Sequence, residues 1–291
     1  MGRKKKTYVS RETDFLCGAD ESPDREYHGE GVLEYRTRTT KGGEYMEVNL
    51  FPAVDLGALL ESNNREEKRA SGRFQRKWEK ANVKRRRGML IHLLNANFDK
   101  HDIIAHLTTS EPMNDEEARR HQQNFVRRLK RLAKKRAHEL HWVCVPEETG
   151  KGERRRWHLH MVLDGGWITR DELEDVWEKG KGHGMAKVER VKSQEKGLAG
   201  FAMYITQRKS TQEKMLKRAW SCSKNLKKPT VSVSKSKFSR KSVAGIIEQA
   251  RDNANVYFEH AYPGYTLIER PEISYSDFLP GAYITAWMKK R

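Results

Sequence analysis

Residues 140–166, which read LHWVCVPEETGKGERRRWHLHMVLDGG, decide the fold. Two apolar runs, residues 140–147 and 156–163, flank the polar stretch ETGKGE, which contains two glycines. Such a pattern is typical of two strands joined as a hairpin. We therefore predict an antiparallel strand pair at this point of the chain.

His158 and His160 lie on the second of these strands. Alternate side chains of a strand point to one face, so the two imidazoles project together and Leu159 points to the core. The triplet alone is weak evidence, because the chain has 11 histidines and a surface pair without a ligand is common. Its weight rises because Glu147 ends the partner strand, while Glu148 is an alternative that should face the opposite side. Two histidines and a carboxylate suit a divalent ion that also holds a phosphate.

The neighbouring segments predict a sheet packed against helices. Residues 102–110 and 184–192 are expected as strands, and a long helix should begin at Asn114 or Asp115, where acidic residues follow the cap. A second helix should follow the cap Thr169, with Glu172 three residues on. This alternation indicates an α/β or α+β fold with helices on the sheet.

Tyr204 is the candidate nucleophile, on a predicted helix over residues 197–209. A lone tyrosine on a helix is usually a packing residue. Here, however, Gln207, Arg208 and Lys209 follow it, and these are unusual neighbours for a buried ring. A tyrosine oxygen that attacks a phosphodiester needs a polarised target, which a metal and a nearby cation supply. Either Arg208 or Lys209 is expected to position the phosphate.

The charge of the chain points to a polyanionic partner. Lys plus Arg is 58 against 40 for Asp plus Glu, so the formal net charge is +18 and the pI is about 9.8. Nucleic acid is the common partner of such a surface, although basic faces also keep proteins soluble. Two groups of residues are expected to contact DNA: cations of the long helix, and a basic segment that includes a tryptophan. They are Arg127, Arg128, Arg131, Trp220, Lys227 and Lys228. The tryptophan could equally be a core residue.

Several classes of protein are excluded by what the sequence lacks. No apolar run approaches the ~20 residues that a membrane span needs. The three cysteines are scattered and form no CxxC pair, so no disulfide framework or zinc finger is expected, and a cytoplasmic location fits. A GxxxxGK[ST] motif is also absent, which argues against a built-in ATP-driven motor.

The expected organisation has three parts. Residues 1–62 are a poorly defined extension, in which Gly42-Gly43 suggests either a hairpin or a ragged extension. Residues 63–229 form the functional domain, led by a basic helix with an apolar stripe of Phe74, Trp78 and Ala81. Residues 230–291 comprise a Ser/Lys-rich linker and an aromatic tail that we expect to form strands, either separately or added to the main sheet.

The order of these motifs resembles a known family. A strand ending in AHLTTS, a basic helix, a strand ending in PEETGKG, the HLH triplet and a helix with Tyr204 follow one another as in HUH-type rolling-circle replication initiators of bacterial phages, prophages and plasmids. The similarity spans residues 84–229. It implies an α+β fold in which a central antiparallel sheet is flanked by helices and carries the histidine pair on a middle strand.

The resemblance also implies a mechanism. Mg²⁺ or Mn²⁺ would be held by His158, His160 and Glu147, and Tyr204 would attack the origin strand, forming a 5′-phosphotyrosine link before the ends are rejoined. The family motif usually reads Tyr-x-x-Lys, but Gln207 stands at the lysine position, so Lys209 or Arg208 would replace that cation and a single nucleophile is expected.

The expected partners follow from this assignment. They are single-stranded or supercoiled origin DNA together with a host helicase and polymerase, and the chain itself is expected as a monomer or weak dimer. A mobilisation relaxase or single-strand transposase would share the chemistry. A non-catalytic DNA-binding protein is the alternative outside this class.

Overall fold

The computed structural model describes residues 7–9, 19–20, 32–55, 85–149, 154, 156–179, 183–192, 195–205, 220–250, 252–276 and 280–291. These residues divide into two compact units. One unit comprises Leu93–Lys228, and the other combines Met1–His92 with Pro229–Arg291. The unit Leu93–Lys228 contains all the described candidate catalytic residues.

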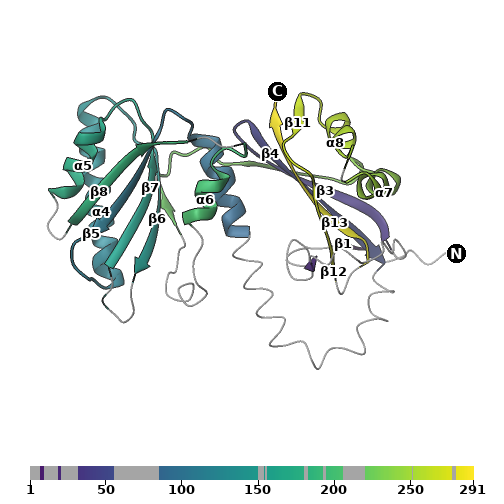
Figure 1. Cartoon of the computed structure of the whole chain (residues 1–291), viewed down its shortest axis with the longest axis horizontal. Coiled ribbons are helices and arrows are strands. Elements are labelled where there is room, and N and C mark those ends of the chain that lie inside the picture. The colour runs from purple at the N-terminus through teal and green to yellow at the C-terminus, as the bar shows by residue number, and fades with distance from the viewer. Residues whose placement is uncertain are drawn as a thin grey trace. The chain divides into compact units, whose positions relative to one another are not determined.

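A five-stranded antiparallel sheet forms the centre of the unit Leu93–Lys228 (Figure 1). Its strands follow the spatial order β8-β5-β7-β6-β9, with bounds β5 Ile103–Thr109, β6 Trp142–Thr149, β7 Arg156–Leu163, β8 His183–Arg190 and β9 Ser221–Cys222. The predicted antiparallel pair is confirmed as β6 and β7, and β7 is the middle strand. The predicted α+β class with antiparallel sheets flanked by helices is likewise confirmed.

Two capped helices cover one face of this sheet. Helix α4 (Asp115–Lys135) begins at a capping box formed by Asn114 and Glu117, and α5 (Arg170–Glu178) begins at a matching box formed by Thr169 and Glu172. Both boxes satisfy backbone N–H groups that the first helical turn leaves without partners. The rings of Phe125 and Trp177 meet edge to face between the two helices, with centroids 5.1 Å apart.

The core under α4 and α5 contains the odd-numbered residues of β7. Leu159, Met161 and Leu163 are buried together with Phe125 and Leu129. Because side chains alternate along a strand, the even-numbered residues His158 and His160 belong to the other face. Helix α6 (Ala199–Ile205) has ring contacts with that other face, through the pairs His106–Phe201 and His160–Tyr204.

The second unit has its own antiparallel sheet, built from both ends of the chain. Its main path is β10-β3-β4-β13-β12-β2, while β1 pairs with β4 and β11 pairs with β13. The bounds are β1 Thr7–Val9, β2 Ala19–Asp20, β3 Val32–Gly42, β4 Tyr45–Asp55, β10 Thr230–Ser234, β11 Tyr265–Leu267, β12 Glu272–Ser276 and β13 Ala282–Lys290. The hairpin expected at Gly42-Gly43 is present as β3 and β4.

The C-terminal segment differs from its expected form. The Ser/Lys-rich stretch contains β10 and helix α7 (Arg240–Glu248), where the composition favours a linker. The aromatic tail begins with a helix, α8 (Asn255–Ala261), and its strands follow. Phe258 of this helix packs against Phe238 in the core of the unit. These strands join β4 and β2, whereas the five-stranded sheet is formed entirely by residues between Leu93 and Lys228.

Residues 85–97 form a further helix, and the stripe of Phe74, Trp78 and Ala81 lies outside the described residues. None of the described helices combines the length and the apolar character that crossing a membrane requires.

Candidate active site

The sheet face opposite α4 and α5 gathers the predicted site residues. In the strand register, His158 is paired with Glu147 on β6 and with Thr108 on β5, whereas His160 is paired with Val145 and His106. His160 is 5% exposed, while the side chain of Glu147 is 37% exposed. The predicted approach of Glu147 to the histidine strand is therefore present.

A line of hydrogen-bonded side chains crosses this face. Glu147 Oε2 lies 2.7 Å from His160 Nε2, and His160 Nδ1 lies 2.9 Å from His106 Nδ1. On the far side of His106, its Nε2 lies 3.4 Å from Glu189 Oε1 on β8. Sequence reasoning did not select His106 or Glu189, because their relevance depends on the pairing of β5 with both β7 and β8.

The contact between the two Nδ1 atoms restricts the tautomers of both rings. One Nδ1 must carry the proton and the other must accept it. If His160 donates from Nδ1, His106 accepts at its Nδ1 and carries its own proton on Nε2, facing Glu189. A metal-binding imidazole usually donates its other ring N–H to a polar partner that fixes its tautomer and orientation, and His106 stands in that place for His160.

The electrostatics agree with a neutral His106. Burial lowers the pKa of His106 below its ordinary value of 6.5, and the nearby His160 lowers it further, although Glu189 opposes the shift. A neutral imidazole has one acceptor nitrogen, as the bond from His160 requires.

The side chains of His158, His160 and Glu147 do not form a complete metal-binding site in this structure. The atoms of His160 and Glu147 converge, and His158 occupies the strand position opposite Glu147. Within the described part of the chain, no three His, Cys, Asp or Glu side chains are grouped closely enough to hold a metal ion. Two imidazole nitrogens and a carboxylate are nevertheless donor types that divalent metal ions accept.

Tyr204 lies beside this line of side chains. Its ring meets the ring of His160 edge to face, with centroids 5.9 Å apart, and its side chain is 61% exposed. Helix α6 holds it there because Ala202 and Ile205 are buried, while Phe201 contacts His106 with a centroid distance of 6.5 Å. An exposed tyrosine next to a buried histidine has the access that a nucleophile needs.

The predicted helper cations Arg208 and Lys209 lie outside the described residues, as does Gln207. The predicted DNA-binding residues lie at several places. Arg127 and Trp220 line one pocket, whereas Arg128 donates a hydrogen bond to the Val176 carbonyl and lies over the Phe125 ring.

The other three predicted DNA-binding residues are exposed. Arg131 lies on α4, and Lys227 and Lys228 follow β9. The backbone N–H of Lys227 donates to the side-chain oxygen of Asn97, which fixes this segment to the helix over residues 85–97.

Part of the chain resembles a known protein family. Residues 102–210 match the family model described as replication-associated protein ORF2/G2P. The matched segment contains β5, β6, β7 and α6, and with them Glu147, both histidines and Tyr204. The match supports a replication initiator family. Searches of curated proteins and of solved structures gave no significant match.

Proposed function

We propose that this chain is an HUH-type rolling-circle replication initiator, which nicks and rejoins origin DNA through Tyr204. The observation that carries the proposal is the placement of the exposed Tyr204 ring 5.9 Å from the ring of His160. Both residues lie in the segment that matches a replication-associated family. That match favours replication over the relaxase and transposase alternatives, which share the chemistry.

The proposed reaction exchanges one phosphate ester for another. The phenolic oxygen of Tyr204 loses its proton and attacks the phosphorus, while the bond from phosphorus to the 3′ oxygen breaks. The leaving oxygen takes up a proton and becomes a free 3′-OH, and the 5′ phosphate stays on Tyr204. Attack by a 3′-OH on this phosphotyrosine reverses the exchange and rejoins the strand.

His158, His160 and Glu147 are the proposed holders of Mg²⁺ or Mn²⁺. When bound, the ion would polarise a phosphate oxygen and stabilise the charge that develops during transfer. His106 and Glu189 would orient the His160 ring, and this role is supported by the 2.9 Å contact between the two Nδ1 atoms.

The proposed partners follow from the net charge of the chain and from the absence of an ATP-binding motif in its sequence. A net charge of +18 favours single-stranded or supercoiled origin DNA as the substrate. Because the sequence has no nucleotide-binding loop for a motor, strand separation and synthesis would fall to a host helicase and polymerase.

A covalent-adduct assay tests the proposal without knowledge of the origin. The full chain is incubated with labelled single strands of random sequence and Mn²⁺, and denaturing electrophoresis detects protein joined to DNA. The wild type should form the adduct, whereas Tyr204→Phe and wild type in EDTA should form none. Met203→Leu, an exposed neighbour on α6, is the matched control. An undiminished adduct in Tyr204→Phe would contradict the assignment.

A further inference from the structure

Strand β10 lies at one end of the sheet that both termini build, and its outer edge is open. Among the described strands it pairs with β3 alone, in an unbroken antiparallel register from Thr230 opposite Lys41 to Ser234 opposite Thr37. In an antiparallel ladder only alternate residues bond to a given neighbour, so the remaining backbone groups of β10 point away from β3. Residues 230–233 are exposed. β10 therefore offers N–H and C=O groups with which a further strand can pair.

The other described strand edges are less suited to this. β1, β2, β9 and β11 have only two or three residues each. β8, at an end of the five-stranded sheet, packs against α5 and carries charges that are already paired. Lys187 Nζ and Lys192 Nζ lie 3.9 and 4.0 Å from the carboxylate oxygens of Glu189. β10 is the longer edge whose neighbouring charges are not used in this way.

The two faces of β10 differ in character. Val231 and Val233 lie on one face and are 44% and 62% exposed. Because successive side chains of a strand alternate, Thr230, Ser232 and Ser234 lie on the other face. A strand added beside β10 would thus meet apolar side chains on one face and hydroxyl groups on the other.

A lysine lies on the hydroxyl face. Lys237 Nζ is 4.8 Å from the centre of the Tyr262 ring, and the Tyr262 hydroxyl is 2.7 Å from Thr39 Oγ1. Thr39 is the register partner of Ser232, so the ring and the cation over it belong to this face. Lys235 follows the end of the strand, and neither lysine forms an ion pair with any described residue. Both charges are therefore available to carboxylates of a partner.

A second copy of the chain is a poor occupant of this edge. Antiparallel pairing of two β10 strands about Ser232 would set the start of each strand against the end of the other. Lys228 precedes the strand, and Lys235 and Lys237 follow it, so like charges would meet. Lysines beside an edge strand are a common protection against such self-pairing. The same lysines attract a strand of opposite charge.

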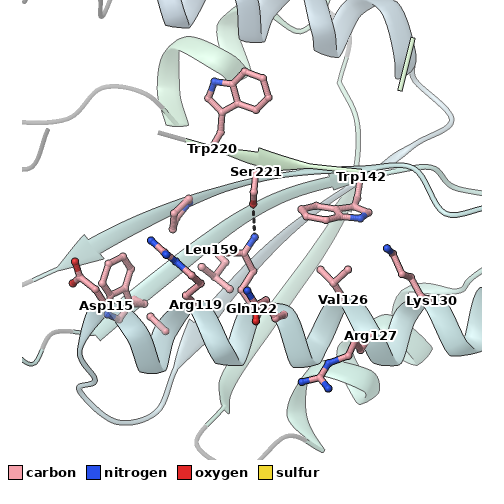
Figure 2. Close-up of a pocket in the computed structure, with 14 residues that line it drawn as sticks. Asp115, Arg119, Gln122, Val126, Arg127, Lys130, Trp142, Leu159, Trp220 and Ser221 are labelled. Carbon is pink, nitrogen blue, oxygen red and sulfur yellow. Dashed lines mark hydrogen bonds between the residues drawn. The ribbon is translucent and has the colours of Figure 1, made fainter. Parts of the chain in front are cut away.

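The pocket of about 700 Å³ beside α4 is another basic surface (Figure 2). Arg119, Arg127 and Lys130 line it. The neighbouring strand β9 has only two residues, and its Ser221 hydroxyl accepts a hydrogen bond of 2.5 Å from the Gln122 side chain of α4. This pocket offers positive charge without a usable strand edge, so it provides a control for attraction by charge alone.

We propose that β10 binds an extended acidic segment of a partner protein, which joins the sheet as a further strand. In this segment acidic residues alternate with apolar ones. The acidic side chains contact Lys235 and Lys237, and the apolar side chains cover Val231 and Val233. In such strand addition the backbone hydrogen bonds supply affinity, and the alternating side chains supply specificity. The proposal rests on none of the nicking residues.

Designed peptides test the addition of a strand. The probe is a short labelled peptide in which Glu and Val alternate, and its control has the same composition with Glu and Val in separate blocks. Binding to the full chain in EDTA is measured by fluorescence anisotropy. The alternating peptide should bind roughly ten-fold more tightly, because only its two faces match the two faces of β10.

N-methylated versions of the alternating peptide separate backbone pairing from charge. Methyl groups are placed on alternate backbone nitrogens, in two versions shifted by one residue. One version should lose binding, because its methyl groups replace the N–H donors that face β10, and the other should bind like the parent. Equal binding of both versions would overturn the proposal, since charge alone would then hold the peptide.

Variants of the chain locate the site. Lys235→Glu/Lys237→Glu should weaken binding of the alternating peptide about ten-fold, through two lost charge pairs. Arg119→Glu/Lys130→Glu makes the same change in net charge on α4 and should leave binding near the wild-type value. Val231→Thr/Val233→Thr keeps β-branched side chains and should weaken binding about three-fold. Chemical denaturation checks that each variant is folded, and equal weakening by the two charge variants would contradict the proposal.

Two competing occupants give different results. If oligothymidylate displaces the peptide from the wild type and itself binds Lys235→Glu/Lys237→Glu more weakly, the edge belongs to nucleic acid. If the chain forms a dimer that Val231→Thr/Val233→Thr dissociates, the edge belongs to a second copy. Either result overturns the proposal. Because binding is measured without metal, a chain that forms no phosphotyrosine adduct can still bind the peptide, and a chain that nicks normally can fail to bind it.

Discussion

The Nδ1 atoms of His106 and His160 lie 2.9 Å apart across the β5–β7 ladder. This contact continues on one side to Glu189 and on the other to Glu147, so four side chains from four strands form one line. The surroundings of the His160 ring therefore include two residues outside the predicted ligand set, His106 and Glu189, and the first prediction concerns His106.

His106→Ala should weaken the Mn²⁺ affinity of the proposed site about 10–100-fold, the range found when a supporting partner of a ligand is removed. The loss should appear in the Mn²⁺ concentration needed for half-maximal nicking, with the rate recovering at saturating Mn²⁺. Glu189→Gln keeps a hydrogen-bond acceptor and should have a smaller effect. A loss of rate that excess metal does not repair would show that His106 acts on the reaction in another way.

Tyr204→Phe should abolish nicking, a loss of roughly 10³-fold or more for removal of a nucleophile. Because the Tyr204 side chain is 61% exposed, the free energy of unfolding should change by no more than about 0.5 kcal/mol. Chemical denaturation and single-strand binding in EDTA measure these two controls. A large drop in stability would mean that the Tyr204 hydroxyl has a structural role.

Asn114→Ala should destabilise the protein by about 1 kcal/mol, the usual cost of an N-cap. The Asn114 side chain accepts a hydrogen bond of 2.9 Å from the Glu117 N–H, and Glu117 Oε2 accepts one of 2.9 Å from the Asn114 N–H. Asn114→Ser keeps an oxygen at the cap and should retain most of the stability. Urea unfolding of both variants gives the comparison, and equal loss in both would contradict a capping role.

His121 should make stability fall in mildly acidic solution. Burial lowers the pKa of His121 below its ordinary value of 6.5; Glu117 opposes the shift, and Arg128 and Arg120 add to it. Below pH 6.5 the unfolded chain therefore binds a proton that the folded chain does not, so the free energy of unfolding decreases as the pH falls. Above pH 6.5 this contribution is constant.

His121→Gln removes that proton from both states, so the decrease between pH 7 and pH 5 should be smaller than in the wild type. Unfolding by urea at several pH values measures the difference. Parallel curves for the two proteins would show that other groups account for the acid sensitivity.

The sequence predicts the functional unit well because its signals are local. The capping boxes at Asn114 and Thr169 determine where α4 and α5 begin, and the two neighbouring apolar runs pair with each other as β6 and β7. Alternation on β7 then places His158 and His160 on one face. Each of these inferences uses residues close together in the chain.

The remaining features depend on contacts between distant segments. His106 enters the site because β5, some fifty residues earlier in the chain, pairs with β7, and a sequence pattern does not specify that neighbour. The terminal segments are harder still. β4 pairs with β13 as well as with β3, so the sheet is completed only when the N-terminal and C-terminal stretches pair with each other.

The two-ended sheet has a consequence for synthesis of the chain. β13 ends at Lys290 and lies between β4 and β12, whereas the unit Leu93–Lys228 is encoded wholly before it. During synthesis from the N-terminus, residues 93–228 are therefore all available to fold before β13, the strand that pairs with β4, has been made. The nascent protein acquires the proposed nicking residues early, and the discontinuous unit is the last to be assembled.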